Sequence, residues 1–251
     1  MEQQQSYGRP LIIGHRGAAG EAPENTLASF KLAIEQGADA LELDVHESAD
    51  GDIIVCHDHT VDRTTDGTGR IDAMLADELR KLDAGAWFSP SYAGERVPLL
   101  AEVFAAVPQH IMINVEIKCD YSARLSIRLL QLLVEYGRMD SVVVSSFNHK
   151  TLLRLKHDHP ALRIGLLYVG DLVHHAKLAD ISGMDVYSLH PHYAGIGAED
   201  VQEAVRCGLK VYPYTINEPQ HLQQAIAAGC TGIITDYPAR LKQLLDDSSV
   251  E

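Results

Sequence analysis

The chain has 251 residues, of which 46% are hydrophobic, so it can bury a full core within one domain. Its formal net charge of −14 argues against binding to a nucleic-acid backbone, which requires clusters of Lys and Arg. The four cysteines have no paired spacing, so neither a zinc site nor a disulfide framework is predicted.

The first ten residues are polar and lack the apolar stretch of a secretion signal. No apolar run in the sequence is long enough to span a bilayer. We therefore expect a soluble cytoplasmic protein that binds neither nucleic acid nor a membrane. The oligomeric state stays open.

The chain begins with the pattern of a β-α-β unit. Residues 11–14 are an apolar run of strand type, and His15 and Arg16 follow at once. A helix is predicted to open at Asn25 or Thr26, both good N-caps, and to stop at Gly37. The next predicted strand covers residues 38–45. Such a crossover implies that the two strands are parallel.

An irregular segment interrupts the pattern after a short apolar strand at 53–56. Between residues 59 and 98 the alternation breaks, although 75–82 could form a short helix. Regular alternation then resumes. The remaining predicted helices are 99–107, 122–136, 149–158, 171–179, 198–206, 219–228 and 238–245, and the remaining strands are 111–117, 142–146, 163–168, 184–189, 210–215 and 232–235.

About eight of the predicted strands open a β-α unit. This count predicts an α/β protein of the (β/α)8 TIM-barrel class, with a small insertion after the second βα unit. We expect a single domain over residues 1–251, with the insertion at about 59–98. A doubly wound sheet is disfavoured, because no Gly-x-Gly-x-x-Gly follows a strand.

Acidic side chains interrupt two of the core strands. Glu42 and Asp44 share one strand face, and Glu116 and Lys118 share a face of another. Buried carboxylates are costly unless a charge or a metal compensates them. A hard divalent cation would do so, and oxygen ligands favour Ca²⁺ or Mg²⁺ over Zn²⁺. The alternative is an inward salt-bridge cluster without a metal.

Two histidines lie at the same predicted rim. His15 ends the first strand and His57 follows the strand at 53–56, so they are the natural acid–base pair. His190 and His192 follow the sixth predicted strand and are weaker candidates for substrate contacts. A histidine after a strand is otherwise usually a surface or capping residue.

Several motifs along the chain together resemble the glycerophosphodiester phosphodiesterase family, in its bacterial cytosolic form. The resemblance covers nearly the whole chain. The motifs are His15-Arg16-Gly17, Pro23-Glu24-Asn25-Thr26, Glu42-x-Asp44, His57-Asp58 with Arg63-Thr64-Thr65, Val115-Glu116-Ile117-Lys118, Ser145-Ser146-Phe147 and Gly232-Ile233-Ile234-Thr235-Asp236-Tyr237-Pro238.

The resemblance implies a metal-dependent phosphoric diester hydrolase on a TIM barrel. Its substrates would be glycerophosphodiesters such as glycerophosphocholine or glycerophosphoethanolamine, cleaved to glycerol 3-phosphate and an alcohol. The cofactor would be a divalent metal, Mg²⁺ or Ca²⁺. By position, the metal ligands would be Glu42, Asp44 and Glu116, the acid–base pair His15 and His57, and the phosphate-holding groups Arg16 and Lys118.

Two positions depart from the family pattern, and several choices stay open. Tyr214 stands where many relatives have tryptophan, and Ser48 stands where threonine is common. We assign His15 as base and His57 as acid, although the reverse direction and attack by either water or the substrate's 2-hydroxyl remain possible. The rival functions are a phospholipase D/C-like enzyme of the same barrel fold and a non-catalytic binding barrel.

Overall fold

Parallel pairing between neighbouring strands forms a barrel in this chain. In the computed structural model, residues 8–247 are described, and residues 1–7 and 248–251 lie outside this range. The strands in the described range are β1 (Leu11–His15), β2 (Ala40–Glu47), β3 (Ile53–Val55), β4 (Met112–Ile117), β5 (Val142–Ser146), β6 (Arg163–Tyr168), β7 (Ser188–Pro191), β8 (Lys210–Val211) and β9 (Gly232–Thr235).

Eight of these described strands form the wall of the barrel. Their order is β8-β7-β6-β5-β4-β2-β1-β9, and every neighbouring pair is parallel. Backbone hydrogen bonds between the segments of β8 and β9 close the ring. Thr231 N–H donates to the Val211 carbonyl at 3.1 Å, and Ile234 N–H donates to that of Pro213 at 3.1 Å. The expected (β/α)8 barrel is confirmed.

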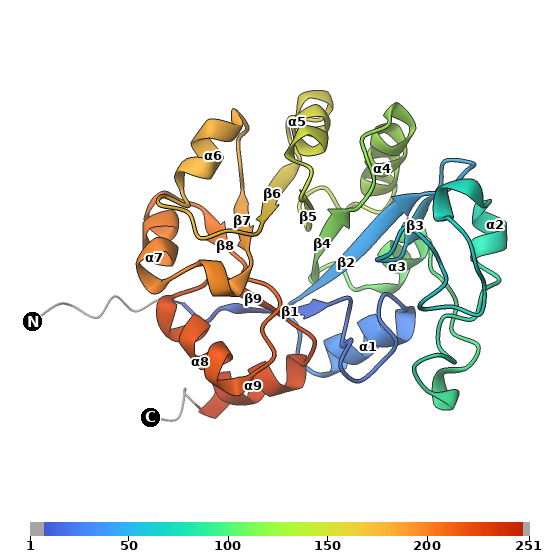
Figure 1. Cartoon of the computed structure of the whole chain (residues 1–251), viewed down its shortest axis with the longest axis horizontal. Coiled ribbons are helices and arrows are strands. Elements are labelled where there is room, and N and C mark those ends of the chain that lie inside the picture. The colour runs from blue at the N-terminus through green and yellow to red at the C-terminus, as the bar shows by residue number, and fades with distance from the viewer. Residues whose placement is uncertain (1–7, 248–251) are drawn as a thin grey trace, which may run out of the picture.

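Helices surround the strands on the outside (Figure 1). They are α1 (Leu27–Glu35), α2 (Ala76–Leu79), α3 (Leu100–Ala106), α4 (Ala123–Glu135), α5 (His149–Asp158), α6 (Lys177–Ser182), α7 (Ala198–Arg206), α8 (Pro219–Ala228) and α9 (Pro238–Asp247). Each of the eight barrel strands is followed by one of these helices, and α2 is an additional helix between β2 and α3. As predicted, Thr26 caps α1 through its side chain, which accepts from the Ser29 N–H.

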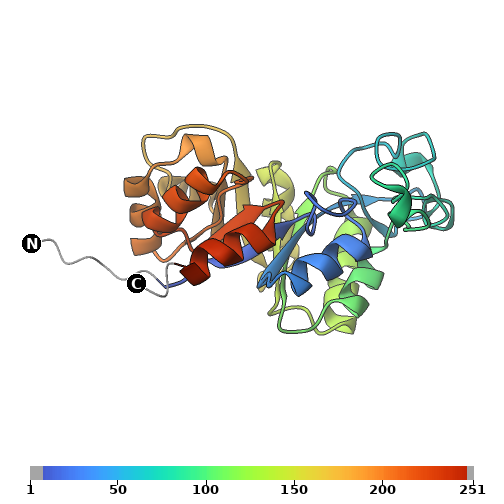
Figure 2. The same ribbon diagram turned by 90° about the horizontal axis from the view of Figure 1, so that it is seen from below.

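The segment between β2 and α3, which we call the excursion, stands beside the barrel rather than in it (Figures 1 and 2). It contains β3, which pairs antiparallel with β2, and α2, which is shorter than the predicted helix at 75–82. It therefore lies inside the second β/α unit, between its strand and its helix. The excursion has a small core of its own, formed by Ile54, Cys56, Val61, Ile71, Ala76, Leu79, Ala84 and Val97.

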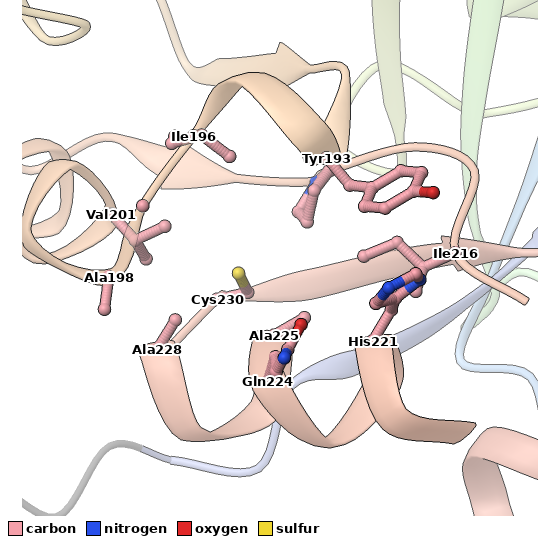
Figure 3. Close-up of a pocket in the computed structure, with 12 residues that line it drawn as sticks. Tyr193, Ile196, Ala198, Val201, Ile216, His221, Gln224, Ala225, Ala228 and Cys230 are labelled. Carbon is pink, nitrogen blue, oxygen red and sulfur yellow. The ribbon is translucent and has the colours of Figure 1, made fainter. Parts of the chain in front are cut away.

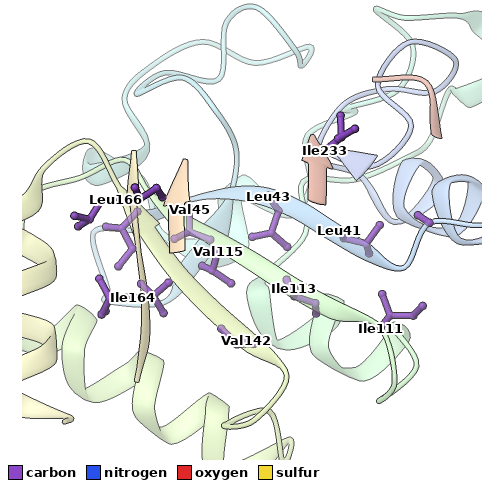
Figure 4. Close-up of a cluster of buried hydrophobic side chains, with 14 of the residues drawn as sticks. Leu41, Leu43, Val45, Ile111, Ile113, Val115, Val142, Ile164, Leu166 and Ile233 are labelled. Carbon is purple, nitrogen blue, oxygen red and sulfur yellow. The ribbon is translucent and has the colours of Figure 1, made fainter. Parts of the chain in front are cut away.

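The main core lies between the barrel strands and the helices. Leu41 and Leu43 of β2 face outward into it beside Ile113 and Val115 of β4, and all four are fully buried (Figure 4). Because side chains alternate along a strand, the intervening residues of β2 and β4 must face the barrel interior. This alternation is what directs the acidic residues inward.

The α6 region differs from the prediction of a helix at 171–179. The imidazole of buried His175 is held between two groups of the preceding segment. Its Nδ1 lies 2.8 Å from the Tyr168 hydroxyl, and its Nε2 accepts from the Leu172 N–H at 3.2 Å. These bonds hold residues 171–176 as a loop, so the helix begins later.

Strands β7 and β8 also have other bounds than predicted. β7 runs from Ser188 to Pro191 rather than from 184 to 189, and because it ends later than predicted, His190 lies within the strand instead of after it. β8 ends after Val211, although the prediction continued to 215. Pro213 accounts for the shorter strand, because it has no N–H to donate to a ladder.

Arg138 ties two helices together and gives a stability prediction. It is fully buried after α4, and its guanidinium donates to four carbonyls at and beyond the end of α3, those of Phe104, Val107, Pro108 and Ile111. Arg138→Met should lower the free energy of unfolding by about 2–3 kcal/mol, because buried acceptors lose their donors. Urea denaturation followed by circular dichroism measures this.

Arg206→Met is the matched control, because Arg206 is exposed at the end of α7. Its substitution should change the unfolding free energy by no more than about 0.5 kcal/mol. Equal effects of the two substitutions would contradict the capping role of Arg138.

Candidate active site

Three carboxylates meet inside the barrel, near the C-terminal ends of β2 and β4. In the sheet register Glu42 pairs with His15, and Asp44 pairs with Glu116, so the residues are neighbours across adjacent strands. One carboxylate oxygen from each of Glu42, Asp44 and Glu116 lies within 4.8 Å of the others, and all three residues are buried. We call these residues the acidic triad.

The triad's carboxylates affect one another's protonation. Burial and then repulsion by Asp44 and Glu116 raise the pKa of Glu42 well above its usual value. Burial and then Asp44 likewise raise the pKa of Glu116, to about 7. The pKa of Asp44 is lowered, because the cations Arg16 and Lys118 outweigh the effect of its burial.

Two cationic side chains flank the triad. Arg16 Nε lies 3.2 Å from Asp44 Oδ2, and Lys118 Nζ lies 2.8 Å from Glu116 Oε1 and 3.6 Å from Asp44 Oδ1. Arg16 has a left-handed backbone with φ of 51°, which is uncommon for a residue with a side chain. This conformation accompanies a hydrogen bond from its N–H to Glu42 Oε2 at 3.0 Å.

The donor set of the triad fits a hard divalent cation. All the candidate ligand atoms are carboxylate oxygens, which suit Mg²⁺ and Ca²⁺. The ion pairs given above reach Asp44 and Glu116, whereas Glu42 accepts the Arg16 N–H and lies 4.0 Å from His15 Nε2. A bound cation would relieve the repulsion that raises the pKa of Glu42 and Glu116.

His15 is held by a carboxylate on the opposite side from the triad. Its Nδ1 lies 2.6 Å from Asp236 Oδ1, while its Nε2 faces Glu42. Asn217 in turn donates to Asp236 Oδ2 at 2.5 Å and accepts from the Asp236 N–H. An Nδ1–H bonded to a carboxylate leaves Nε2 free for proton transfer.

His57 has a partner of the same kind in the next residue. Its Nδ1 lies 2.6 Å from Asp58 Oδ1, and its backbone carbonyl is 3.1 Å from the Nε2 of His46. Burial lowers the pKa of His57, against the opposing effect of Asp44. Burial also lowers the pKa of His46, to about 4, so His46 is neutral near pH 7. The two acid–base candidates are thus both anchored through Nδ1.

The two weaker histidine candidates differ in their exposure. His190 is fully buried in the barrel interior, where its Nε2 lies 2.8 Å from the Ser188 hydroxyl, and burial lowers its pKa to about 3. It is a core side chain. His192 is partly exposed, and its Nδ1 accepts from the Ala194 N–H.

Four residues of the site have contacts that sequence reasoning did not assign to them. Asp236 and Asp58 hold the histidines, Asn25 donates to Asp44 Oδ2 at 2.9 Å, and Glu24 accepts from Arg16 at 2.9 Å. All four belong to motifs that the sequence analysis quoted. Membership of these motifs was the available signal, and only Asp58 is also adjacent to a candidate residue, His57. The motifs did not indicate which atoms would meet.

A separate cavity of about 250 Å³ lies between α7 and α8 (Figure 3). It is lined mainly by apolar side chains, among them Val201, Ile216 and Ala225, with His221 and Gln224 as polar members. No carboxylate lines it. The titratable groups that could do chemistry are gathered at the barrel's acidic triad instead.

Comparisons with known proteins agree on one family. Residues 15–240 match the model of the glycerophosphoryl diester phosphodiesterase family. A glycerophosphodiester phosphodiesterase of Caldanaerobacter subterraneus subsp. tengcongensis is 42% identical over 240 residues, which are 94% of this chain and 98% of the relative.

Two solved structures have the same fold. A phosphodiesterase of Oleispira antarctica, in complex with the product sn-glycerol-3-phosphate, aligns with a TM-score of 0.87 and 31% identity over 95% of this chain and 97% of that one. A glycerophosphodiester phosphodiesterase of Agrobacterium tumefaciens aligns with a TM-score of 0.81 and 28% identity over 93% and 99%. Among the described residues, no helix has the length and apolar character needed to cross a membrane.

Proposed function

Because this chain belongs to the glycerophosphoryl diester phosphodiesterase family, we propose that it cleaves small glycerophosphodiesters at the acidic triad. The substrates are diesters such as glycerophosphocholine and glycerophosphoethanolamine, and the products are glycerol 3-phosphate and an alcohol. The observation that carries this proposal is the buried triad, flanked by two cations and two carboxylate-bound histidines.

Glu42, Asp44 and Glu116 are the proposed ligands of a divalent cation, Mg²⁺ or Ca²⁺. When bound, such a cation polarises the phosphoryl group and stabilises its developing negative charge. Arg16 and Lys118 add fixed positive charge beside it, and both are held by the triad itself. Charge that is already in place before the reaction is usually the largest catalytic contribution.

The two histidines transfer the protons. Each presents Nδ1 to a carboxylate, so each has Nε2 available for the reacting groups. In our assignment His15 takes the proton of the nucleophile and His57 protonates the departing alkoxide. Both water and the substrate's own 2-hydroxyl suit His15 as the base, the second giving a cyclic phosphate first.

We also propose that residues 1–251 work as one domain, with residues 59–98 as its insertion. The enzyme would act in the cytoplasm, without a nucleic-acid or membrane partner, in the metabolism of glycerol and deacylated lipids. The polar excursion residue Arg63 reaches the site, which supports an insertion that takes part in function.

The proposed reaction can be tested with the purified protein. With Mg²⁺ or Ca²⁺ present, it should release glycerol 3-phosphate from glycerophosphocholine and glycerophosphoethanolamine, measured by coupling to glycerol-3-phosphate dehydrogenase. The triple variant Glu42→Gln, Asp44→Asn, Glu116→Gln is the control for contaminating hydrolase. If the wild type released no more product than this variant from any of several headgroups, the proposed substrates would be wrong.

A lysophospholipid is a second candidate substrate, of the phospholipase D-like class. Apolar side chains are exposed where the chain leaves β5 and β6, namely Phe147 at 47%, Val169 at 73% and Val173 at 87%. Such side chains could contact an acyl chain. Release of choline from lysophosphatidylcholine, compared with glycerophosphocholine at equal concentration, distinguishes the two substrates.

A further inference from the structure

Arg63 in the excursion binds two carboxylates at once. Its Nε and Nη2 donate to Asp58 at 2.7 and 3.1 Å. Its Nη1 and Nη2 donate to Glu24 at 2.9 and 2.8 Å. Both contacts are bidentate, so the planar guanidinium fixes the orientation of each carboxylate as well as its place.

Each of these carboxylates also holds a residue of the proposed catalytic machinery. Asp58 Oδ1, which accepts from Arg63, is the atom that lies 2.6 Å from His57 Nδ1. Glu24 Oε1, which accepts from Arg63, also accepts from Arg16 Nη1 at 2.9 Å. A continuous chain of hydrogen bonds therefore runs from His57 through Arg63 to Arg16.

We propose that Arg63 is a positioning residue that couples the proton-transferring His57 to the phosphate-holding Arg16, through Asp58 on one side and Glu24 on the other. The inference rests on the proposed function, in which those two residues act on the same phosphodiester. It assigns a role to the Arg63-Thr64-Thr65 motif, and it makes the excursion part of the catalytic apparatus.

The surroundings distinguish this arrangement from an ordinary surface ion pair, which contributes little. The side chain of Glu24 is only 13% exposed and that of Arg16 only 17%, although Arg63 is 43% exposed. Hydrogen bonds from Arg63 hold the pKa of Asp58 far below its usual value. They also help to lower the pKa of Glu24, against the effect of its burial. Both carboxylates are thus charged acceptors for their partners.

Loss of the Arg63 guanidinium should affect both ends of this hydrogen-bond chain, His57 and Arg16. Asp58 would be free to turn away from His57, and Glu24 would lose the partner that fixes its orientation, so that Arg16 would no longer be held in place for the phosphate. Arg63→Met should lower kcat/KM on glycerophosphocholine about 10- to 100-fold, the range for residues that orient a ligand or catalytic group. Arg63→Lys should recover only part of this loss, because an ammonium cannot hold two carboxylates bidentately.

Two single variants test the two ends of the hydrogen-bond chain separately. Glu24→Gln should weaken binding of sn-glycerol 3-phosphate, measured by calorimetry in the presence of Mg²⁺, with a smaller effect on kcat. Asp58→Asn should lower kcat on glycerophosphocholine but largely spare a p-nitrophenyl diester of glycerol 3-phosphate, whose leaving group needs no proton. In an Arg63→Met background, each of these changes should cost much less than it does alone.

Arg70→Met is the matched control. Arg70 lies in the same excursion and makes an equivalent bidentate pair with Asp72, away from the triad. Its loss should leave all rates and product binding unchanged. Unfolding midpoints of all variants are measured alongside, so that a loss of folded protein is recognised.

Three results would overturn the coupling. One is an Arg63→Met enzyme with wild-type product affinity and the same proportional loss on both diesters, which indicates a structural role. Another is full additivity of Glu24→Gln and Asp58→Asn with Arg63→Met. The third is a wild type that neither hydrolyses a diester nor binds sn-glycerol 3-phosphate. Of the three results, only this one would also contradict the proposed function.

Discussion

Chelation should abolish hydrolysis, and Mg²⁺ or Ca²⁺ should restore it. Without a cation, three buried carboxylates oppose an anionic phosphodiester, and Arg16 and Lys118 are already engaged with the triad. We expect the metal-free protein to lose on the order of 10³-fold in kcat/KM, comparable to the loss of a central electrostatic group in other enzymes. The measurement is glycerol 3-phosphate release after exhaustive dialysis against EDTA, before and after titration with each metal.

Single substitutions place the cation on the triad. Glu42→Gln keeps the side-chain volume but removes a charge, so it should raise the metal concentration needed for half-maximal activity. Glu47→Gln is the matched control. Glu47 lies on the same strand β2 and pairs with Arg124 away from the triad. Full activity in rigorously metal-free enzyme, or equal shifts for both variants, would contradict a cation at the triad.

Replacement of either histidine should cost about 10²–10⁴-fold, but on different substrates. If His57 protonates the leaving alcohol, His57→Ala should lose this factor on glycerophosphocholine, because choline is a poor leaving group. An aryl diester releasing p-nitrophenol needs no proton on departure and should be largely spared. His15→Ala removes the base and should damage both substrates to a similar degree. The measurement is kcat/KM for both variants on both diesters at one metal concentration.

His59→Ala serves as the control, because His59 is exposed near His57 and its ring contacts His46 rather than the triad. It should retain near-normal rates. An opposite pattern, in which His15→Ala spares the aryl diester and His57→Ala does not, would exchange the two roles. Near-normal rates for both variants on both diesters would remove these histidines from the mechanism.

The sequence predicted the parts of the site that depend on strand periodicity. Glu42 and Asp44 alternate with Leu41 and Leu43, so their inward direction follows from the pleat of β2 once its outer face is known to be apolar. The barrel then brings Glu116 beside Asp44 by register. Three carboxylates far apart in sequence could thus be assigned to one place before any coordinates.

Residues whose position depends on loops were beyond such reasoning. The pairing of His15 with Asp236 joins residues 221 positions apart, and the pairing of Arg63 with Glu24 joins residues 39 apart. Periodicity gives no information on which loop atoms meet. His190 was misplaced for another reason. Its strand ends two residues later than predicted, at Pro191 rather than 189, so His190 is a buried strand residue and not a rim residue.

The separate core of the excursion has a consequence for protein engineering. Its apolar cluster includes Val61, Ile71 and Leu79 and is distinct from the core of the barrel, so the excursion could be transplanted between relatives as a module. The module has an inner boundary, however. Residues 57–63 include His57, Arg63 and the Asp58 carboxylate that links them, and a chimaera should keep these residues with the recipient barrel, where Glu24 and Arg16 are fixed. Recombination should therefore be confined to the stretch beyond Arg63.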